Sequence, residues 1–251
     1  MTGPVYLISG ANRGIGLALV QEIARKHPDA IVYAGTRNPS TSEDLNDFAA
    51  GSSGKVRPVK LVSSDVENNK TVAEQIEKEV GHIDTVIPNA AIADFVGPVI
   101  DTPAEEVRRH YEVNFVGTLI LFQATYKLLK ASQKPKFVPI SAGGASSKYA
   151  GLTVAIMPYL SSKVALNYLT RKIHVENEWL VSFPLAPGVV VTDMLAGVLA
   201  GDKTGALAKL NDMQGLSPEE SAKRVMSIID GATREKEGGE FWDVDGSKLP
   251  W

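Results

Sequence analysis

Short apolar runs alternate along the chain with longer segments in which apolar residues recur at a helical period. Short apolar and β-branched runs predict seven strands: Val5–Ser9, Ile31–Thr36, Val56–Val62, Thr85–Ile87, Phe137–Ser141, Leu180–Leu185 and Glu240–Val244. Between them, apolar residues recur at a helical period over Gly14–Lys26, Thr71–Val80, Pro103–Leu129, Pro158–Glu176 and Pro218–Asp230. Such alternation is typical of βα units. The pattern therefore predicts an α/β fold: a doubly wound parallel sheet of about seven strands with helices on both faces.

Three prolines, Pro88, Pro139 and Pro184, fall in or beside these predicted strands. Proline has no backbone N–H, so it cannot donate a hydrogen bond to a neighbouring strand. The sequence predicts one of two outcomes at each proline. Either the strand is locally irregular, or the missing N–H faces a position where no donor is needed.

Composition narrows the class of protein. A chain of 251 residues with 44% hydrophobic and 22% charged residues is typical of a globular protein, and we expect one domain over residues 1–251. The absence of cysteine fits a reducing compartment, so a cytoplasmic location is expected. A net charge of -3 without a basic run argues against nucleic-acid binding. No apolar stretch reaches the roughly 18 residues of a membrane span.

A glycine-rich segment joins the first predicted strand to the first predicted helix. Glycines allow a tight turn and bring backbone N–H groups close to a pyrophosphate at a helix N-terminus. A tight structural turn without a ligand is the alternative. The segment reads Ser9-Gly10-Ala11-Asn12-Arg13-Gly14-Ile15-Gly16.

Further motifs follow in order along nearly the whole chain: Asp65-Val66, Asn89-Ala90-Ala91, Asn114, Tyr159-Leu160-Ser161-Ser162-Lys163 and Pro187-Gly188-Val189-Val190-Val191-Thr192. Together with the glycine segment, this series resembles the short-chain dehydrogenase/reductase family, and most of all its fungal ketoreductases of the norsolorinic acid reductase kind. The resemblance implies a Rossmann-type fold and a nicotinamide-dependent oxidoreductase. Two departures are that Ser9 replaces the usual threonine and Ala91 the usual glycine.

Tyr159 and Lys163 are the candidate catalytic pair. Four residues apart on a helix, they share one face and lie within electrostatic reach. A free tyrosine has a pKa of about 10, which a nearby cation lowers. The resemblance implies that Tyr159 gives its proton to a substrate carbonyl while Lys163 also holds the nicotinamide ribose.

The third catalytic group is less settled by the sequence. Ser141, at the end of a predicted strand, is expected to polarise the carbonyl. The family usually has a second serine here, where this chain has Ala142, so Ser146 or no serine at all stays open. By resemblance, Asn114 bends its helix and holds a water in a proton relay. A purely structural asparagine is the alternative.

The end of the second predicted strand indicates the cofactor. No acid stands beside Thr36, where NAD enzymes place one, while Arg37 and Arg13 suit a 2′-phosphate. NADP, as NADPH, is therefore expected, and no metal. The resemblance adds these cofactor-binding residues: Gly10, Asn12, Gly14, Ile15, Gly16, Asp65, Val66, Asn89, Tyr159, Lys163, Val190 and Thr192. A turn or cap role is the alternative for Asp65.

These observations predict an NADPH-dependent carbonyl reductase of the EC 1.1.1 type, with a small ketone or aldehyde as substrate. A catalytically silent NADP(H)-binding sensor or scaffold is the alternative. Neither the ketone nor the physiological direction follows from the sequence. The substrate pocket is expected from Ala142–Met157 and Met194–Asp212, and family analogy predicts a homodimer or homotetramer through Pro103–Leu129 and Pro158–Glu176.

Overall fold

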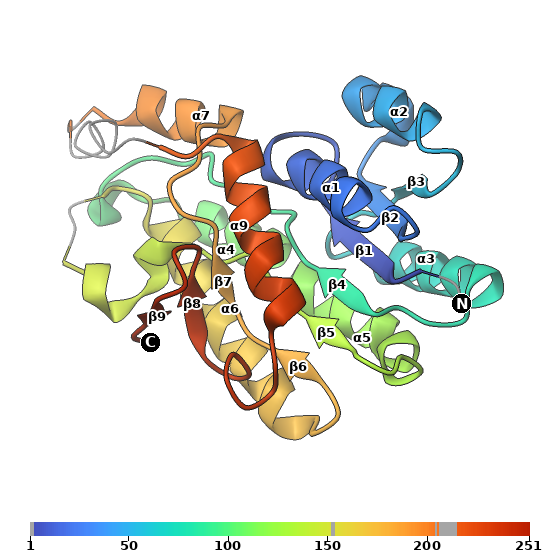
Figure 1. Cartoon of the computed structure of the whole chain (residues 1–251). Coiled ribbons are helices and arrows are strands. Elements are labelled where there is room, and N and C mark those ends of the chain that lie inside the picture. The colour runs from blue at the N-terminus through green and yellow to red at the C-terminus, as the bar shows by residue number, and fades with distance from the viewer. Residues whose placement is uncertain (1–2, 152–153, 204, 206–214) are drawn as a thin grey trace.

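The computed structural model describes residues 3–151, 154–203, 205 and 215–251. Parts of both expected pocket segments, at 152–153 and within 204–212, lie outside the described residues. Six parallel strands form the main sheet in the order β3-β2-β1-β4-β5-β6 (Figure 1). They are β1 (Val5–Ser9), β2 (Ile31–Thr36), β3 (Val56–Lys60), β4 (Thr85–Ile87), β5 (Lys136–Phe137) and β6 (Val181–Ser182).

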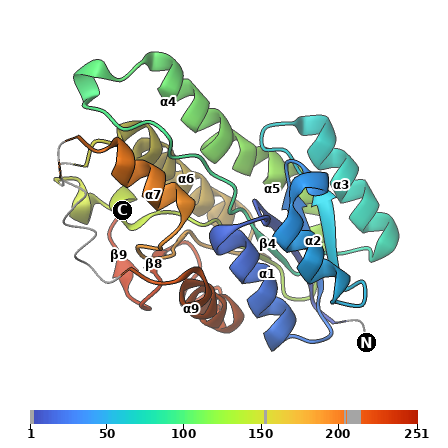
Figure 2. The same cartoon turned by 90° about the horizontal axis from the view of Figure 1, so that it is seen from above.

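Helices cover both faces of this sheet because its central strands are apolar on both sides. In β1, Val5 and Leu7 belong to one core cluster, and Tyr6 and Ile8 to the other. The first cluster includes residues of α3 (Val66–Glu79), α5 (Gly117–Lys130) and α6 (Met157–Glu176). The second includes residues of α1 (Gly14–Lys26), α2 (Glu43–Ala50) and α9 (Pro218–Gly231) (Figure 2). The predicted doubly wound α/β fold is confirmed.

The three prolines explain why the strand count differs from the prediction. Instead of one sheet of about seven strands, the described residues form the six-stranded sheet and a three-stranded one, β7 (Leu185–Ala186), β8 (Phe241–Asp243) and β9 (Lys248–Leu249). The register places the prolines level with one another on neighbouring strands. Their carbonyls still accept hydrogen bonds, Pro88 from Ile140, Pro139 from Leu185 and Pro184 from Trp242, at 2.8, 3.0 and 3.1 Å.

The predicted strands Phe137–Ser141 and Leu180–Leu185 are therefore each cut short. A proline accepts a hydrogen bond from the next strand but donates none, so the ladder stops beside it. The remaining link between these segments is the bridge between Ile140 and Leu185. Local irregularity, one of the two outcomes left open by the sequence, is what the structure shows.

Helix boundaries differ where caps or bulges were not recognised. The helix predicted at Thr71–Val80 begins at Val66, because the Asp65 carboxylate caps it by accepting the N–H of Asn68 at 2.9 Å. The segment predicted as one helix over Pro103–Leu129 comprises α4 (Ala104–Tyr111), a π-helical stretch at Glu112–Val116 and α5. Helices α2 and α7 (Asp193–Gly201) were not predicted. Among the described residues, no helix has the length and apolarity to cross a membrane.

Candidate active site

A cavity of about 500 Å³ opens at the carboxyl ends of the strands, where ligands bind in sheets of this kind. It joins the glycine-rich turn after β1 to the end of β2, the segment after β4, helix α6 and the start of α7. Most of the predicted site residues line it: Gly10, Asn12, Arg13, Gly14, Ile15, Gly16, Arg37, Asn89, Ser141, Tyr159, Lys163 and Thr192.

The glycine turn has a shape that side chains would not permit. Gly10 and Gly14 have φ angles of 66° and 54°, in the left-handed region that favours glycine. At Gly16, a Cβ atom would lie 2.0 Å from the carbonyl oxygen of Gly10. The Asn89 side chain fixes the turn by donating to the carbonyls of Ser9 and Gly10, at 3.1 and 3.0 Å. The turn thus leaves its backbone facing the cavity beside the start of α1.

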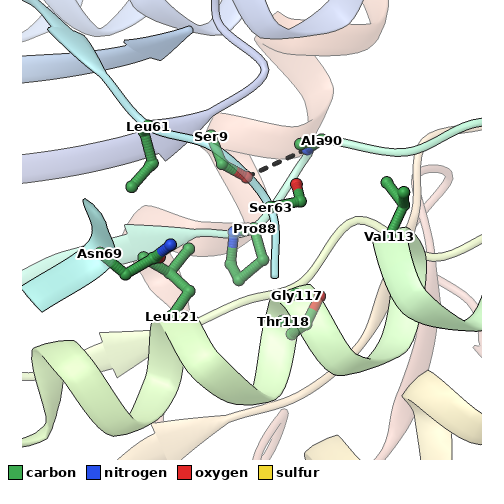
Figure 3. A pocket seen from close by; sticks show the side chains of 10 residues that line it. All are labelled: Ser9, Leu61, Ser63, Asn69, Pro88, Ala90, Val113, Gly117, Thr118 and Leu121. Atoms are coloured by element: carbon green, nitrogen blue, oxygen red, sulfur yellow. Dashed lines mark hydrogen bonds between the residues drawn. The ribbon is translucent and has the colours of Figure 1, made fainter. Parts of the chain in front are cut away.

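Ser9 ties the glycine turn to the segment after β4. Its Oγ accepts the backbone N–H groups of both Asn89 and Ala90 at 3.0 Å, and Figure 3 shows the bond from Ala90. Below it lies a cavity of only about 10 Å³, barely the space that one water molecule needs. The sequence marked Ser9 only as a departure from threonine, and its role as an acceptor for two N–H groups follows from the structure.

Tyr159 and Lys163 lie on the wall of the large cavity, on the first turns of α6. Tyr159 is partly buried, and the loss of water around its phenol raises the pKa to about 12. Burial lowers the pKa of Lys163 to about 7. The Lys163 Nζ atom lies 5.8 Å from the Tyr159 ring centre and donates to the Ile140 carbonyl at 2.7 Å. The expected lowering of the Tyr159 pKa by Lys163 is therefore not what the structure shows, because burial dominates and the tyrosine keeps its proton at neutral pH.

Ser141 lines the cavity, but its hydroxyl is already engaged. It donates to the Asn167 side-chain carbonyl at 2.5 Å, and both residues are buried. Ser146, the alternative, is buried outside the lining of this cavity and donates to the Pro250 carbonyl at 2.6 Å. Of the two serines, only Ser141 has access to the cavity.

Asn114 sits in the π-helical stretch between α4 and α5, which matches the expected break in that helix. Its side chain is fully buried and fully engaged. The carbonyl accepts the N–H of Ile92 at 2.8 Å, and the amide donates to the Ile92 carbonyl and to Ser162 Oγ, both at 3.0 Å. Asn114 therefore joins the segment after β4 to α6, next to Lys163.

The two arginines of the cavity differ in their partners. Arg37 is exposed and makes no hydrogen bond or ion pair with any residue that the structure describes. Arg13 donates to the Asp193 carboxylate at 2.7 Å. Polar residues that the sequence reasoning missed, Asn38, Thr41 and Ser42, also line this end of the cavity. The polar run directly after a buried strand was the signal that could have found them.

Three predicted cofactor residues do not line the cavity. Asp65 caps α3, the role named as its alternative, and Val66 is the exposed first residue of that helix. Val190 is buried and forms a bridge with Leu216. The cofactor contacts expected at these three positions stay predictions.

An apolar cluster packs against Tyr159. Its buried members are Ala93, Ile156 and Val198, which come from the segment after β4, the segment before α6 and helix α7. The partly buried residues packed against them are Val96, Val154, Tyr159, Leu160 and Leu199. The cluster thus places an apolar wall against Tyr159, built partly from the two segments expected to form the substrate pocket and partly from the segment after β4.

One group of potential metal ligands occurs among the described residues, Asp94, Glu106 and His110. The guanidinium of Arg109 already donates to both carboxylates, at 2.6–2.8 Å. A cation there would meet that positive charge, and the group lies outside the cavity lining.

The profile of the short chain dehydrogenase family matches residues 4–203. Norsolorinic acid ketoreductase nor1 of Dothistroma septosporum is 37% identical, covering 98% of this chain and 92% of its own length. The norsolorinic acid ketoreductase of Aspergillus parasiticus is 35% identical, with 98% and 91% covered. Among solved structures, the KRED1-Pglu enzyme has a TM-score of 0.85 at 29% identity, covering 95% of this chain and 99% of its own. An NADPH-bound carbonyl reductase from chicken fatty liver has a TM-score of 0.88 at 25% identity, covering 100% of both chains. The chain is an oxidoreductase that belongs to the short-chain dehydrogenase/reductase family.

Proposed function

We propose that this chain is an NADPH-dependent ketoreductase that acts on a small ketone or aldehyde, with residues 1–251 forming one NADP-binding domain. The observation that carries the proposal is the position of Tyr159 and Lys163. Both face the cavity that the glycine turn borders, and Tyr159 also belongs to the apolar wall beside it. A proton donor thus stands where a nucleotide cavity and an apolar surface meet. The ketoreductase names of the relatives point the same way.

The cavity residues fit a nicotinamide dinucleotide. Gly10, Gly14 and Gly16 leave backbone facing the cavity at the N-terminus of α1, the arrangement that receives a pyrophosphate. When bound, the cofactor supplies the hydride. Lys163 is placed to hold the ribose hydroxyls. Thr192 also lines the cavity and lies against Gly14, with its methyl carbon 3.4 Å from where a Gly14 Cβ would be.

Proton transfer is the task of Tyr159. With a pKa raised to about 12, the phenol of Tyr159 carries its proton throughout the neutral range, and the positive charge of Lys163 has to lower this pKa for efficient donation to the carbonyl oxygen. Ser141 polarises that oxygen once its hydroxyl turns away from Asn167, and Asn114 keeps the segment after β4 in place behind the pair. The residues are therefore set for reduction of a carbonyl at neutral pH.

Cofactor preference tests the assignment of the 2′-phosphate site. Arg37 is exposed, without a partner among the described residues, and lies at the end of β2 beside Asn38 and Thr41. Replacing Arg37 with Asp puts a repelling charge where a charge-assisted hydrogen bond is expected. NADPH binding should weaken about tenfold to a hundredfold relative to NADH binding. The ratio of the two dissociation constants measures this, and an unchanged ratio contradicts the role of Arg37.

A cofactor-binding sensor or scaffold is the second candidate, favoured by the engagement of Ser141 with Asn167. The loss of NADPH absorbance at 340 nm, followed with a panel of aromatic and aliphatic ketones, separates the two. Turnover with any ketone of the panel supports the reductase. Tight NADPH binding without turnover across the panel supports the sensor.

A homodimer or homotetramer in the cytoplasm completes the proposal. Val164, Tyr168 and Val175 lie four and seven residues apart on α6, and each is more than half exposed. This spacing gathers them towards one side of the helix, an apolar stripe that a second copy would cover. Light scattering at micromolar concentration should show a dimer or tetramer, and a monomer alone would refute it.

A further inference from the structure

The ion pair between Arg13 and Asp193 joins two parts of the cavity that lie far apart in the sequence. Arg13 belongs to the glycine turn, and Asp193 is the first residue of α7. The pair is 2.7 Å long, and its side chains are 66% and 78% exposed. Both residues line the cavity, so the pair bridges its rim.

The pair directs Arg13 away from the end of β2. In the main sheet, β1 lies between β2 on one side and β4 on the other. Asp193 follows β7, which bridges to the segment after β5, beyond β4. In both overall views α1 lies between α2 and α7 (Figures 1 and 2). Arg13 is thus paired with the start of α7, whereas Arg37 lies at the end of β2, and the proposed 2′-phosphate site needs both arginines.

We propose that Asp193 is a specificity-determining residue for the cofactor, because it competes with the 2′-phosphate of NADP(H) for Arg13. The inference rests on the proposed NADPH preference. Binding of NADP(H) exchanges one anionic partner of the guanidinium for another, while NADH offers no phosphate there and leaves the pair with Asp193 intact. Asp193 thus weakens NADPH binding selectively and sets how strongly the enzyme prefers it.

The position of Asp193 also links this exchange to the substrate side. Thr192 caps α7 by accepting the N–H of Leu195 at 3.3 Å, and Asp193 follows directly. Further along the same helix, Val198 and Leu199 belong to the apolar cluster around Tyr159. When Arg13 leaves Asp193, the N-terminal end of α7 loses its side-chain ion pair with the glycine turn. The same helix that borders the substrate wall therefore loses this one tie to the glycine turn when NADP(H) binds, while its Thr192 cap remains.

The experiment measures dissociation constants of NADPH and NADH by isothermal titration for wild type, Asp193→Asn, Arg13→Ala and the double variant. Asparagine keeps the shape of the side chain and removes its charge. An exposed ion pair of this kind changes an equilibrium constant by about two- to fivefold. Asp193→Asn should therefore raise the ratio of the NADH dissociation constant to the NADPH dissociation constant by that factor. Asp193→Glu, which keeps the carboxylate, should stay near the wild-type ratio.

The Arg13→Ala background separates competition from other effects of the charge. Asp193→Asn also removes a negative charge near the pyrophosphate and at the N-terminus of α7. This loss would change the binding of both cofactors, and the change would also occur in a protein without Arg13. Competition for Arg13 does not persist, so the double variant should show the ratio of Arg13→Ala alone. A ratio that stays unchanged or falls in Asp193→Asn overturns the inference, as does an equal rise in both backgrounds. Equal affinity of wild type for NADPH and NADH would instead overturn the proposed cofactor preference.

Discussion

In the N-terminal half of the sheet, β1, β2 and β3 pair over five residues in unbroken parallel register. In the C-terminal half, β5 and β6 each have only two residues, and prolines end the ladder before β7, which belongs to the smaller sheet. Both halves contribute to one cavity. The N-terminal half presents the glycine turn together with polar side chains such as Arg13 and Arg37, whereas the C-terminal half presents the side chains of Ser141, Tyr159 and Lys163.

This difference shows two ways of fixing a site. A regular ladder carries the glycine turn to the cavity, and the side chains of Ser9 and Asn89 then tie that turn to the segment after β4. Where the ladder stops, hydrogen bonds from side chains take its place: Lys163 reaches the Ile140 carbonyl, and Ser141 reaches Asn167. We therefore expect substitutions in the C-terminal half to alter chemistry and titration, and substitutions in the N-terminal half to alter backbone packing and cofactor binding.

The largest effect is expected for Tyr159→Phe. The change removes one phenolic oxygen and keeps the ring, so folding and NADPH binding should persist while proton donation is lost. General acid catalysis commonly contributes about 10² to 10⁴-fold, and kcat for ketone reduction should fall by that much. Steady-state rates and NADPH titrations measure the two properties separately. A variant that keeps most of its activity would overturn the mechanism.

Lys163→Met should affect binding, rate and titration together. It removes the expected ribose contact, so NADPH affinity should fall about tenfold or more along with the rate. The cofactor-free protein offers a second measurement, the free energy of unfolding against pH.

Burial lowers the pKa of Lys163 from its ordinary 10.5 to about 7. Between these values the unfolded chain binds the proton and the folded chain does not, so this lysine makes stability rise with pH from about 7 to about 10. The slope reaches at most about 1.4 kcal/mol per pH unit. The difference between wild type and Lys163→Met isolates this contribution from other titrating groups. Equal slopes would show that Lys163 is not desolvated.

The difference between the two halves of the sheet also explains how much of the fold could be predicted from the sequence. The bounds of β1, β2, β4 and α1 were right, because a short continuous apolar run marks a strand buried on both faces and a period of 3.6 marks the helix. Strands β5 and β6 were predicted too long, since apolar residues around Pro139 and Pro184 read as strand while proline ends the ladder. The π-helical stretch at Asn114 has no periodic signal of its own.

The site residues also divide into those that the sequence could predict and those that it could not. Motifs placed the glycine turn and the Tyr159–Lys163 pair correctly at one cavity, because their spacing along one element fixes their geometry. The partners Asn167, Pro250 and Asp193 are distant in sequence from the residues they contact, so spacing alone could not reveal them. The choice between Ser141 and Ser146 needed these long-range contacts.

In the N-terminal half, Gly16→Ala tests the dependence on bare backbone. The added methyl would lie 2.0 Å from the Gly10 carbonyl oxygen, so the turn must shift. Such overpacking typically costs about 1–3 kcal/mol, and NADPH binding should weaken with it. Chemical denaturation and cofactor titration measure the two effects. Gly231→Ala is the matched control, because its Cβ meets no atom within 4 Å, so it should leave NADPH binding unchanged and raise stability by at most about 1 kcal/mol. Equal behaviour of the two variants would show that the turn tolerates side chains.

The smallest effect is expected for Ser146→Ala, which separates structural from chemical use of a serine in the C-terminal half. Ser146 donates to the Pro250 carbonyl and accepts the N–H of Lys148, so it holds the chain near its C-terminus against the segment before α6. Its loss should lower the free energy of unfolding by about 1 kcal/mol and leave kcat unchanged, because the hydroxyl does not line the cavity. Thermal denaturation and initial rates, each compared with Ser141→Ala, measure this. Ser141→Ala should lower kcat because its hydroxyl is the one with access to the substrate carbonyl. The reverse result, with Ser146→Ala impaired in kcat and Ser141→Ala fully active, would transfer the polarising role to Ser146 and require the segment around it to move on substrate binding.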